Sequence, residues 1–239
     1  MSPSGVTVST RLHRRSDAAL SCSSVQGIRP SRTLETVESG DVEMTGQAEA
    51  GAQIAPDVVL GSGTRVWELA KIREGVRIGS DCIIGRGVYI GVDVRLGDRC
   101  KVQNNALIYD PADLGDGVFV GPGAILTNDR LPRAISPSGI LKRSNDWEPV
   151  GVSIATGASI GAGAICVAPV RIGAWAMVAA GSVVIRDVPD HALVGGNPAR
   201  FIGWVGRDGR RMTVDGNALL DSSTGLRFVE SGGLLSPLM

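Results

Sequence analysis

Few residues of this sequence have the type and spacing that catalysis or metal binding requires. The four cysteines are scattered without a CxxC pair, and the two histidines, His13 and His191, lie far apart. Neither set has the spacing of a metal site, so we expect no metal. Positive charge is concentrated between residues 127 and 152, a stretch with three prolines that carries Arg130, Arg133, Lys142 and Arg143. We expect this stretch to contact a substrate or another subunit.

A six-residue period predicts the elements that position these residues. Every sixth residue from Ile54 to Leu126 is aliphatic, and the period resumes from Ile154 to Val184 with one cysteine in phase. A helix would spread these positions around its surface, so each hexad is interpreted as a short strand and a sharp turn. Three hexads make a coil of about 18 residues, and successive coils stack with parallel strand pairing. The stretch 127–152 interrupts the period, which indicates a loop extruded from a corner.

The same period places two of the cysteines. Cys82 and Cys100 are 18 residues apart, which is one coil, so we expect them to stack inside the prism as packed core rather than as metal ligands.

Length and composition limit which partners and which cellular location we expect. The chain has 239 residues, a formal net charge of zero, 33 glycines and only 4% aromatic residues. A nucleic acid partner usually requires a basic excess, so we expect none. No apolar run has the length of a membrane span or a signal peptide, and scattered cysteines suit a reducing compartment, so we expect a cytoplasmic protein without a membrane partner. Residues 1–50, which lack the repeat, are interpreted as a mostly disordered arm.

The repeat resembles the left-handed parallel β-helix of the hexapeptide-repeat acyltransferases, over roughly residues 52–204. The resemblance implies an all-β fold in which residues 51–204 form the β-helix and 127–152 its extruded loop. Four motifs narrow the resemblance: Gln103-Asn104-Asn105, Tyr109-Asp110, the Thr127-Asn128-Asp129 to Pro132-Arg133-Ala134 segment, and Gly196-Asn197-Pro198-Ala199-Arg200. Together they are similar to the nucleotide-linked 3-amino sugar N-acetyltransferases, in particular those acting on a UDP-2-acetamido-3-amino uronic acid. Enzymes acting on dTDP-3-amino-dideoxyhexoses share most of these motifs.

The resemblance implies an acetyl-CoA-dependent N-acetyltransferase, active as a homotrimer with each site between neighbouring prisms. Many relatives use a histidine base to deprotonate a hydroxyl acceptor. Here His13 lies in the arm and His191 follows the last coil, so an amine, which attacks without prior deprotonation once neutral, is the favoured acceptor. A γ-class carbonic anhydrase, which needs three histidine ligands, is excluded on the same count.

The resemblance also assigns residues to the acceptor site. Asn128 matches the asparagine that hydrogen-bonds near the sugar amine and the reacting acyl group. The remaining residues that match sugar or nucleotide positions are Gln103, Asn104, Asn105, Tyr109, Asp110 and Asp129. We expect Tyr109 and Asp110 one hexad later on the same corner as Gln103–Asn105. Arg133 is a candidate clamp for a diphosphate or a uronic carboxylate.

Other interpretations of these residues stay open. Asn104 and Asn105 could form an inward asparagine ladder that caps turns, and Tyr109 could be surface packing. Lys71 stands where relatives often have a histidine, and it either binds an acidic group or faces solvent.

For the donor, the resemblance implies that the pantetheine arm of acetyl-CoA lies along the later coils. Small residues there let the arm approach the main chain: Gly157, Gly161, Ala162, Ala179, Ala180 and Gly181. Arg186 and Arg200 are candidates for the CoA phosphates or adenine, or are ordinary solvated arginines.

Residues 205–239 are expected to form a short β-hairpin-like extension. Segments 206–209 and 221–225 resemble the two turns of a small zinc ribbon, but the positions where thiols are needed hold Gly206, Asp208, Asp221 and Thr224. We therefore expect an extension held by packing alone.

Two further functions stay open. One is an O-acetyltransferase that uses Asp110 or Asp129 as its base, and the other is a non-catalytic β-helix scaffold.

Overall fold

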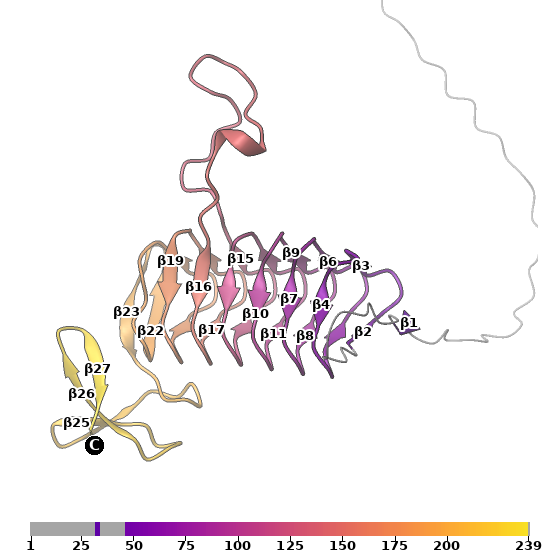
Figure 1. Cartoon of the computed structure of the whole chain (residues 1–239). Coiled ribbons are helices and arrows are strands. Elements are labelled where there is room, and N and C mark those ends of the chain that lie inside the picture. The colour runs from indigo at the N-terminus through magenta and orange to yellow at the C-terminus, as the bar shows by residue number, and fades with distance from the viewer. Residues whose placement is uncertain (1–31, 34–45, 239) are drawn as a thin grey trace, which may run out of the picture. The chain divides into compact units, whose positions relative to one another are not determined.

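A computed structural model describes residues 32–33 and 46–238. Its coils carry three sheets of mostly two-residue strands, and each coil contributes one strand to each sheet (Figure 1). We name the sheets A, B and C, and the turns between them the A–B, B–C and C–A corners. The predicted all-β fold and its parallel β-helix of hexapeptide repeats are confirmed.

Sheet A contains, in spatial order, β1 (Arg32–Thr33), β2 (Gln47–Ala48), β5 (Arg65–Val66), β8 (Ile83–Ile84), β11 (Lys101–Val102), β14 (Phe119–Val120), β17 (Ser159–Ile160), β20 (Met177–Val178), β22 (Ala192–Gly196) and β23 (Ala199–Trp204). Sheet B contains β3 (Gln53–Ile54), β6 (Lys71–Ile72), β9 (Tyr89–Ile90), β12 (Leu107–Ile108), β15 (Ile125–Leu126), β18 (Ile165–Cys166) and β21 (Val183–Val184). Sheet C contains β4 (Val59–Leu60), β7 (Arg77–Ile78), β10 (Arg95–Leu96), β13 (Asp113–Leu114), β16 (Val152–Ile154) and β19 (Val170–Ile172).

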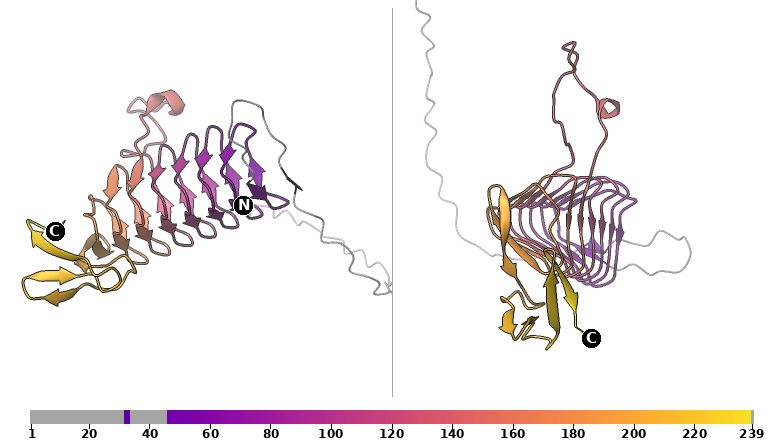
Figure 2. Two further views of the ribbon diagram at one scale, coloured as in Figure 1. Left: turned by 60° about the horizontal axis from the view of Figure 1, so that its bottom comes forward. Right: turned by 90° about the vertical axis from the view of Figure 1, so that its left-hand side faces the viewer.

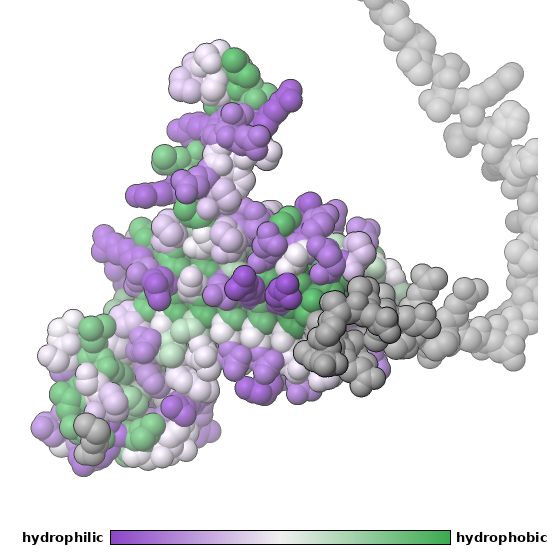
Figure 3. All heavy atoms as spheres, viewed as in Figure 1, coloured by the Kyte–Doolittle hydropathy of each residue, from purple (hydrophilic) through white to green (hydrophobic). Residues whose placement is uncertain are grey.

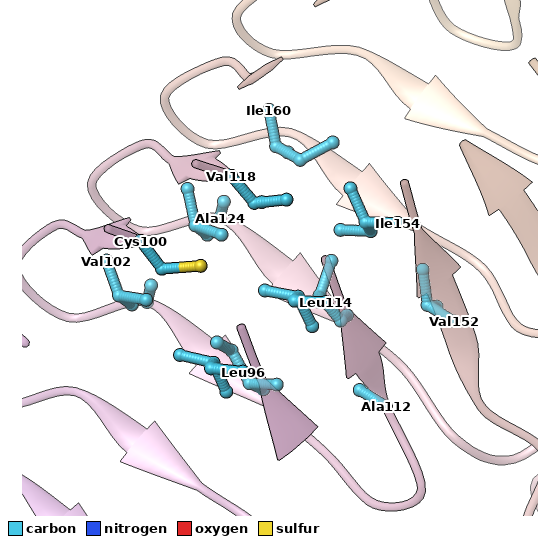
Figure 4. Close-up of a cluster of buried hydrophobic side chains, with 14 of the residues drawn as sticks. Leu96, Cys100, Val102, Ala112, Leu114, Val118, Ala124, Val152, Ile154 and Ile160 are labelled. Carbon is cyan, nitrogen blue, oxygen red and sulfur yellow. The ribbon is translucent and has the colours of Figure 1, made fainter. Parts of the chain in front are cut away.

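The register of the coils follows the predicted 18-residue repeat. Leu96 pairs in parallel with Ile78 on one side and with Leu114 on the other. Figure 2 shows the coils stacked one on another. The hexad residues point inward and are buried, except for the half-buried Ile54 in the first coil. Figure 4 shows one section of this core, with Leu96, Leu114 and Ile154 directed into the interior.

Cys82 and Cys100 are buried in the stacked core, as predicted. The backbone N–H of Cys100 donates to Cys82 Sγ at 3.3 Å, and the two thiols donate to the carbonyls of Gly97 and Gly115, both at 3.2 Å. Thr64 occupies the same position one coil earlier, and its hydroxyl accepts the Cys82 N–H at 2.9 Å. Further along the prism, burial raises the pKa of the Cys166 thiol to about 12, which keeps it protonated.

The extruded loop lies between β15 and β16. Within it, residues 134–142 form a small hairpin, with the Lys142 N–H bonded to the Ala134 carbonyl at 2.9 Å, followed by the 3₁₀ helix η1 (Ser144–Asp146). Its exposed side chains include four large aliphatic residues: Leu131, Ile135, Ile140 and Leu141. Figure 3 shows hydrophobic residues on this loop and a hydrophobic band along the coils.

The two ends differ from the expected boundaries. Of the arm expected over 1–50, residues 1–31 and 34–45 lie outside the described residues, whereas β2 already pairs in parallel with β5. At the other end, the extension is a four-stranded antiparallel sheet, larger than a hairpin. Its strands are β24 (Thr213–Asp215), β25 (Ala218–Leu220), β26 (Arg227–Ser231) and β27 (Leu234–Pro237). No helix in the described part of the chain is long and apolar enough to cross a membrane.

The two ribbon-like turns are joined by a carboxylate as well as by packing. Asp221 is buried, and its Oδ2 accepts the Arg207 N–H at 3.1 Å across the two turns. Its Oδ1 accepts the Ser223 N–H at 3.0 Å and the Ser223 hydroxyl at 2.6 Å. The expectation of an extension held by packing alone is therefore wrong at this residue. Over the described residues, no group of three or more His, Cys, Asp or Glu side chains is arranged to hold a metal ion.

Candidate acetyl-transfer site

The structure divides the predicted acceptor residues between the two edges of sheet B. Gln103–Asn105 follow β11 at the A–B corner, whereas Tyr109 and Asp110 follow β12 at the B–C corner. The expectation that both groups share a corner is wrong, because one hexad advances the chain by one face and only 18 residues return it to the same corner. Asn128 follows β15 and shares the B–C corner with Tyr109 and Asp110.

Asn128 is held firmly at the base of the extruded loop. The Val150 N–H donates to the Asn128 carbonyl at 2.9 Å, which closes the loop where it leaves the coils. The neighbouring Thr127 hydroxyl accepts the Ala168 N–H from the next coil at 3.0 Å. The Asn128 side chain is half-buried, and among the described residues its carboxamide forms no hydrogen bond. The backbone is fixed while the carboxamide stays available to a ligand.

At the A–B corner, Gln103, Asn104 and Asn105 differ in their hydrogen bonds and backbone conformations. The Asn104 Oδ1 accepts the Arg86 N–H of the preceding coil at 3.0 Å, so the turn-capping interpretation holds for this residue. Asn105 occupies the left-handed region of the turn at φ 59°, a conformation that asparagine tolerates. Gln103 is half-buried, and its side chain forms no hydrogen bond within the described residues.

Asp129 directly follows Asn128 at the B–C corner, whereas Arg133 lies farther out in the loop. Asp129 uses its Oδ1 to accept the Leu131 N–H at 2.8 Å. Arg133 lines a cavity of about 520 Å³ within the loop itself, together with Lys142 and Asp146. The structure therefore does not bring Arg133 together with Asn128 in one chain.

Lys71 is exposed on the outer face of sheet B, directly beside Tyr89 in the register of β6 and β9. The ring of Tyr89 packs against that of Tyr109, with 5.3 Å between the ring centroids and a 47° tilt. Sequence reasoning missed Tyr89, although its outward position one residue before Ile90 was visible in the six-residue period.

Most of the predicted donor residues form one continuous ridge. Gly161, Ala162, Ala179, Ala180 and Gly181 lie at the A–B corner of two successive coils, on the same edge as Gln103. At Gly181 nothing lies within 4 Å of the position a side chain would take, so the main chain is open to an extended ligand.

Gly157 does not belong to this ridge. It lies at the C–A corner, and a Cβ there would overlap the ring of Trp175. Trp175 in turn lies under the Arg207 guanidinium, 5.1 Å from the ring centroid. The assignment of Gly157 to the donor site is therefore wrong: this glycine makes room for a tryptophan.

Arg186 and Arg200 converge on one cavity at the end of the prism. The cavity measures about 390 Å³ and is lined mainly by apolar groups, including Phe201 and Trp204. The Trp204 indole N–H donates to Glu230 Oε2 at 2.9 Å, which fixes one wall. The aromatic wall was not foreseen, because β23 and β26 meet only in the folded chain.

The described histidine, His191, precedes β22 at the C–A corner, whereas Asn128 lies at the B–C corner. His191 is buried, its Nδ1 lies 2.9 Å from the Val205 carbonyl oxygen, and its ring packs on Phe228 with 5.1 Å between centroids. His13 lies outside the described residues.

Comparison with known proteins shows what the coils are similar to. Residues 57–92 match the family model described as bacterial transferase hexapeptide (six repeats), and residues 75–110 match the hexapeptide repeat of succinyl-transferase. This part of the chain is therefore similar to the hexapeptide repeats of bacterial transferases.

Two curated proteins are similar to parts of the chain. Serine acetyltransferase 4 of Arabidopsis thaliana is 40% identical over 108 residues, covering 44% of this chain and 29% of the relative. Bifunctional protein GlmU of Alkalilimnicola ehrlichii is 35% identical over 188 residues, covering 68% of this chain and 37% of the relative. The hexapeptide-repeat chain thus spans about a third of the length of these relatives.

Solved structures to which the chain is similar include AntD, an N-acyltransferase from Bacillus cereus in complex with dTDP and coenzyme A. It has a TM-score of 0.46 and 20% identity, over 66% of this chain and 80% of AntD. A hexapeptide-repeat acetyltransferase of Vibrio cholerae, complexed with acetyl coenzyme A, has a TM-score of 0.43 and 28% identity, over 54% of this chain and 70% of that one.

Proposed function

We propose that this hexapeptide-repeat protein transfers an acetyl group from acetyl-CoA to the amino group of a nucleotide-linked amino sugar, of the UDP- or dTDP-3-amino type. The observation that carries the proposal is the fixed backbone and available carboxamide of Asn128 at the base of the loop. The name of the Arabidopsis relative, a serine acetyltransferase, supports acetyl transfer as the reaction class.

In this reaction the neutral amine nitrogen attacks the thioester carbonyl, the new C–N bond forms, and the C–S bond breaks. The side-chain oxygen Oδ1 of Asn128 accepts a hydrogen bond from an N–H of the amine. This bond orients the lone pair of the amine nitrogen toward the thioester carbonyl. The amine loses its proton after attack, to the departing thiolate or to water. This order needs no imidazole base, which agrees with the burial of His191 at the C–A corner, away from the corner of Asn128.

The donor is assigned to the A–B edge and the end of the prism. The exposed main chain at Gly181 supports an extended pantetheine arm along Ala162, Ala179 and Ala180, whereas the missing side chain of Gly161 makes room for the main chain of the next coil at Ala180. The cavity shared by Arg186 and Arg200 has apolar walls, which suit the adenine of CoA, and it holds two carboxylates, Asp187 and Glu230, beside the two cations that would face the phosphates.

The separation of the two edges supports a homotrimer. In one chain the donor ridge and Asn128 lie on opposite edges of sheet B, so a site built from both requires the A–B edge of one copy beside the B–C edge of another. The outer face of sheet B supports such contacts, because four consecutive outward positions are apolar: Leu107, Ile125, Ile165 and Val183. The exposed aliphatic residues of the loop would be covered in the same assembly.

O-acetylation of a sugar hydroxyl is the second candidate. Asp129 is engaged with the Leu131 N–H, whereas Asp110, at the same corner as Asn128, forms no side-chain hydrogen bond within the described part of the chain. Asp110 is therefore the carboxylate that stays available to act as a base for a sugar hydroxyl.

The test is thiol release from acetyl-CoA with a panel of UDP- and dTDP-linked 3- and 4-amino sugars. We expect one acceptor to give a product heavier by one acetyl group, stable to mild alkali as an amide is and an ester is not. Asn128→Ala is expected to lower kcat about 10²-fold, a loss typical of a misplaced reacting group. Asn217→Ala, an exposed asparagine in the extension, is the matched control and should keep full turnover. Unchanged turnover of Asn128→Ala would exclude the assigned site.

A further inference from the structure

The outer face of sheet B carries an aromatic pair that the transfer chemistry does not use. Tyr89 and Tyr109 are the two tyrosines of the whole sequence, and they are 20 residues apart. The coil geometry nevertheless brings their rings within 5.3 Å. Both are half-buried on the outside of the prism, so the pair presents ring surface to a ligand.

Cations border this pair on one side and apolar residues on the other. Lys71 is the neighbour of Tyr89 in the register of β6 and β9, and it is exposed. Arg73 follows at the B–C corner. Its pKa is raised above the ordinary value, first by hydrogen bonding to Glu74 and second by hydrogen bonding to Tyr89. On the other side of Tyr89, its partner in the register is Leu107. Leu107 is the first of the four consecutive apolar outward positions of sheet B, which we call the apolar row.

Core packing does not require these rings. The interior of the same coils is closed by Ile72, Ile90 and Ile108, which are at most 2% exposed. Gly91 adds to the shape of the corner, since a Cβ there would lie 2.7 Å from the Asp110 nitrogen. The missing side chain lets Tyr109 and Asp110 sit close over the preceding coil.

We infer that Tyr89 and Tyr109 form the stacking platform for the base of the nucleotide-linked substrate, and that Lys71 contacts its diphosphate. This inference rests on the proposed function for the identity of the ligand. The flat base of the nucleotide matches the pair of aromatic rings, and its diphosphate matches the cations that border them. Both Asn128 and Tyr109 lie at the B–C corner, so the platform and the proposed reacting group share one edge. Aromatic stacking is sequence-tolerant, which suits either UDP or dTDP.

The inference is tested by the affinity of the intact protein for UDP, dTDP and pyrophosphate. Tyr89→Leu and Tyr109→Leu are expected to weaken UDP and dTDP about 5- to 150-fold, the equivalent of the roughly 1–3 kcal/mol of one base–aromatic stack. Pyrophosphate affinity should stay unchanged in both. Tyr89→Phe, which keeps the ring, should retain nucleotide affinity. Phe119→Leu, an outward aromatic on sheet A, is the matched control and should match the wild type.

Three outcomes overturn the platform: no nucleotide binding by the wild type, unchanged nucleotide affinity in both leucine variants, or an equal loss in Phe119→Leu. With 3-fluorotyrosine incorporated, the chain gives two fluorine resonances, and UDP should shift both. Acetyl-CoA binding and thiol release, measured on the same samples, separate the two proposals. Nucleotide binding through the tyrosines without acetyl transfer would leave the platform standing and exclude the proposed reaction.

Discussion

At the residue scale, Asp221 shows how a carboxylate joins two turns that resemble those of a metal site. Burial alone would raise its pKa, but hydrogen bonds from the Ser223 hydroxyl and the Arg207 backbone N–H outweigh burial and lower the pKa to about 2 from 3.8. The charged form is therefore the stabilising one. Two backbone N–H groups and one hydroxyl donate hydrogen bonds to the Asp221 carboxylate. In a ribbon with metal-binding thiolates at these turns, the thiolates would accept such hydrogen bonds instead.

This predicts an acid-sensitive extension. A lowered pKa means that the stabilisation is fully present above about pH 4 and is lost as the pH falls from about 4 to about 2. Asp221→Asn should cost about 2 kcal/mol of unfolding free energy at pH 7, and the difference from wild type should shrink below pH 4. Thermal unfolding across this range checks both points. Asp113→Asn, an exposed carboxylate on sheet C, should change stability by less than about 0.5 kcal/mol, and a pH-independent Asp221→Asn effect would contradict the assignment.

At the element scale, a comparison of two corner glycines with similar backbone conformations distinguishes the effect of backbone strain from that of side-chain packing. Gly157 has φ 73° and Gly163 has φ 64°, so both favour glycine over other residues. A Cβ at Gly157 would overlap Trp175, whereas nothing lies within 4 Å of one at Gly163.

Gly157→Ala is therefore expected to lower the free energy of unfolding about 1–3 kcal/mol more than Gly163→Ala, because only the first adds overpacking to strain. Urea unfolding of the two variants measures the difference. Because Trp175 covers Gly157, acetyl-CoA affinity should survive Gly157→Ala in the folded fraction. Equal destabilisation of the two variants would show that Trp175 moves aside freely.

The sequence predicted the coils better than it predicted the site. A period of six decides which residues point inward, so the core positions and the Cys82–Cys100 stack followed directly. The corner of Tyr109 was misjudged, although the same period places it one face beyond Gln103. Other features could not follow from any local period. The cavity of Arg186 and Arg200 needs β23 and β26 to meet, and the cover over Gly157 depends on the direction of one tryptophan side chain.

At the scale of the whole molecule, we propose that activity depends on assembly, because the proposed site is divided between two edges of sheet B. The apolar row on sheet B is flanked by polar residues at its N-terminal end, where Gln53 and Lys71 occupy the outward positions. Contacts between copies are therefore expected over the later coils, while the tyrosine pair lies at the border of that contact. Such a border is where a nucleotide-linked sugar could enter between two prisms.

Ile165→Glu is expected to dissociate the assembly, because it places a charge in the middle of the apolar row without disturbing the inward-facing neighbour Cys166. Sedimentation velocity should show a trimer for wild type and a monomer for the variant. Acetyl transfer should fall at least 10²-fold, since the donor ridge of one copy no longer faces Asn128 of another. Ile83→Glu, an outward isoleucine of sheet A between Arg65 and Lys101, is the matched control and should remain trimeric and active. A wild-type monomer with full turnover would instead mean that one chain builds the whole site, and the loop would then have to fold back across sheet B to bring Asn128 and the ridge together.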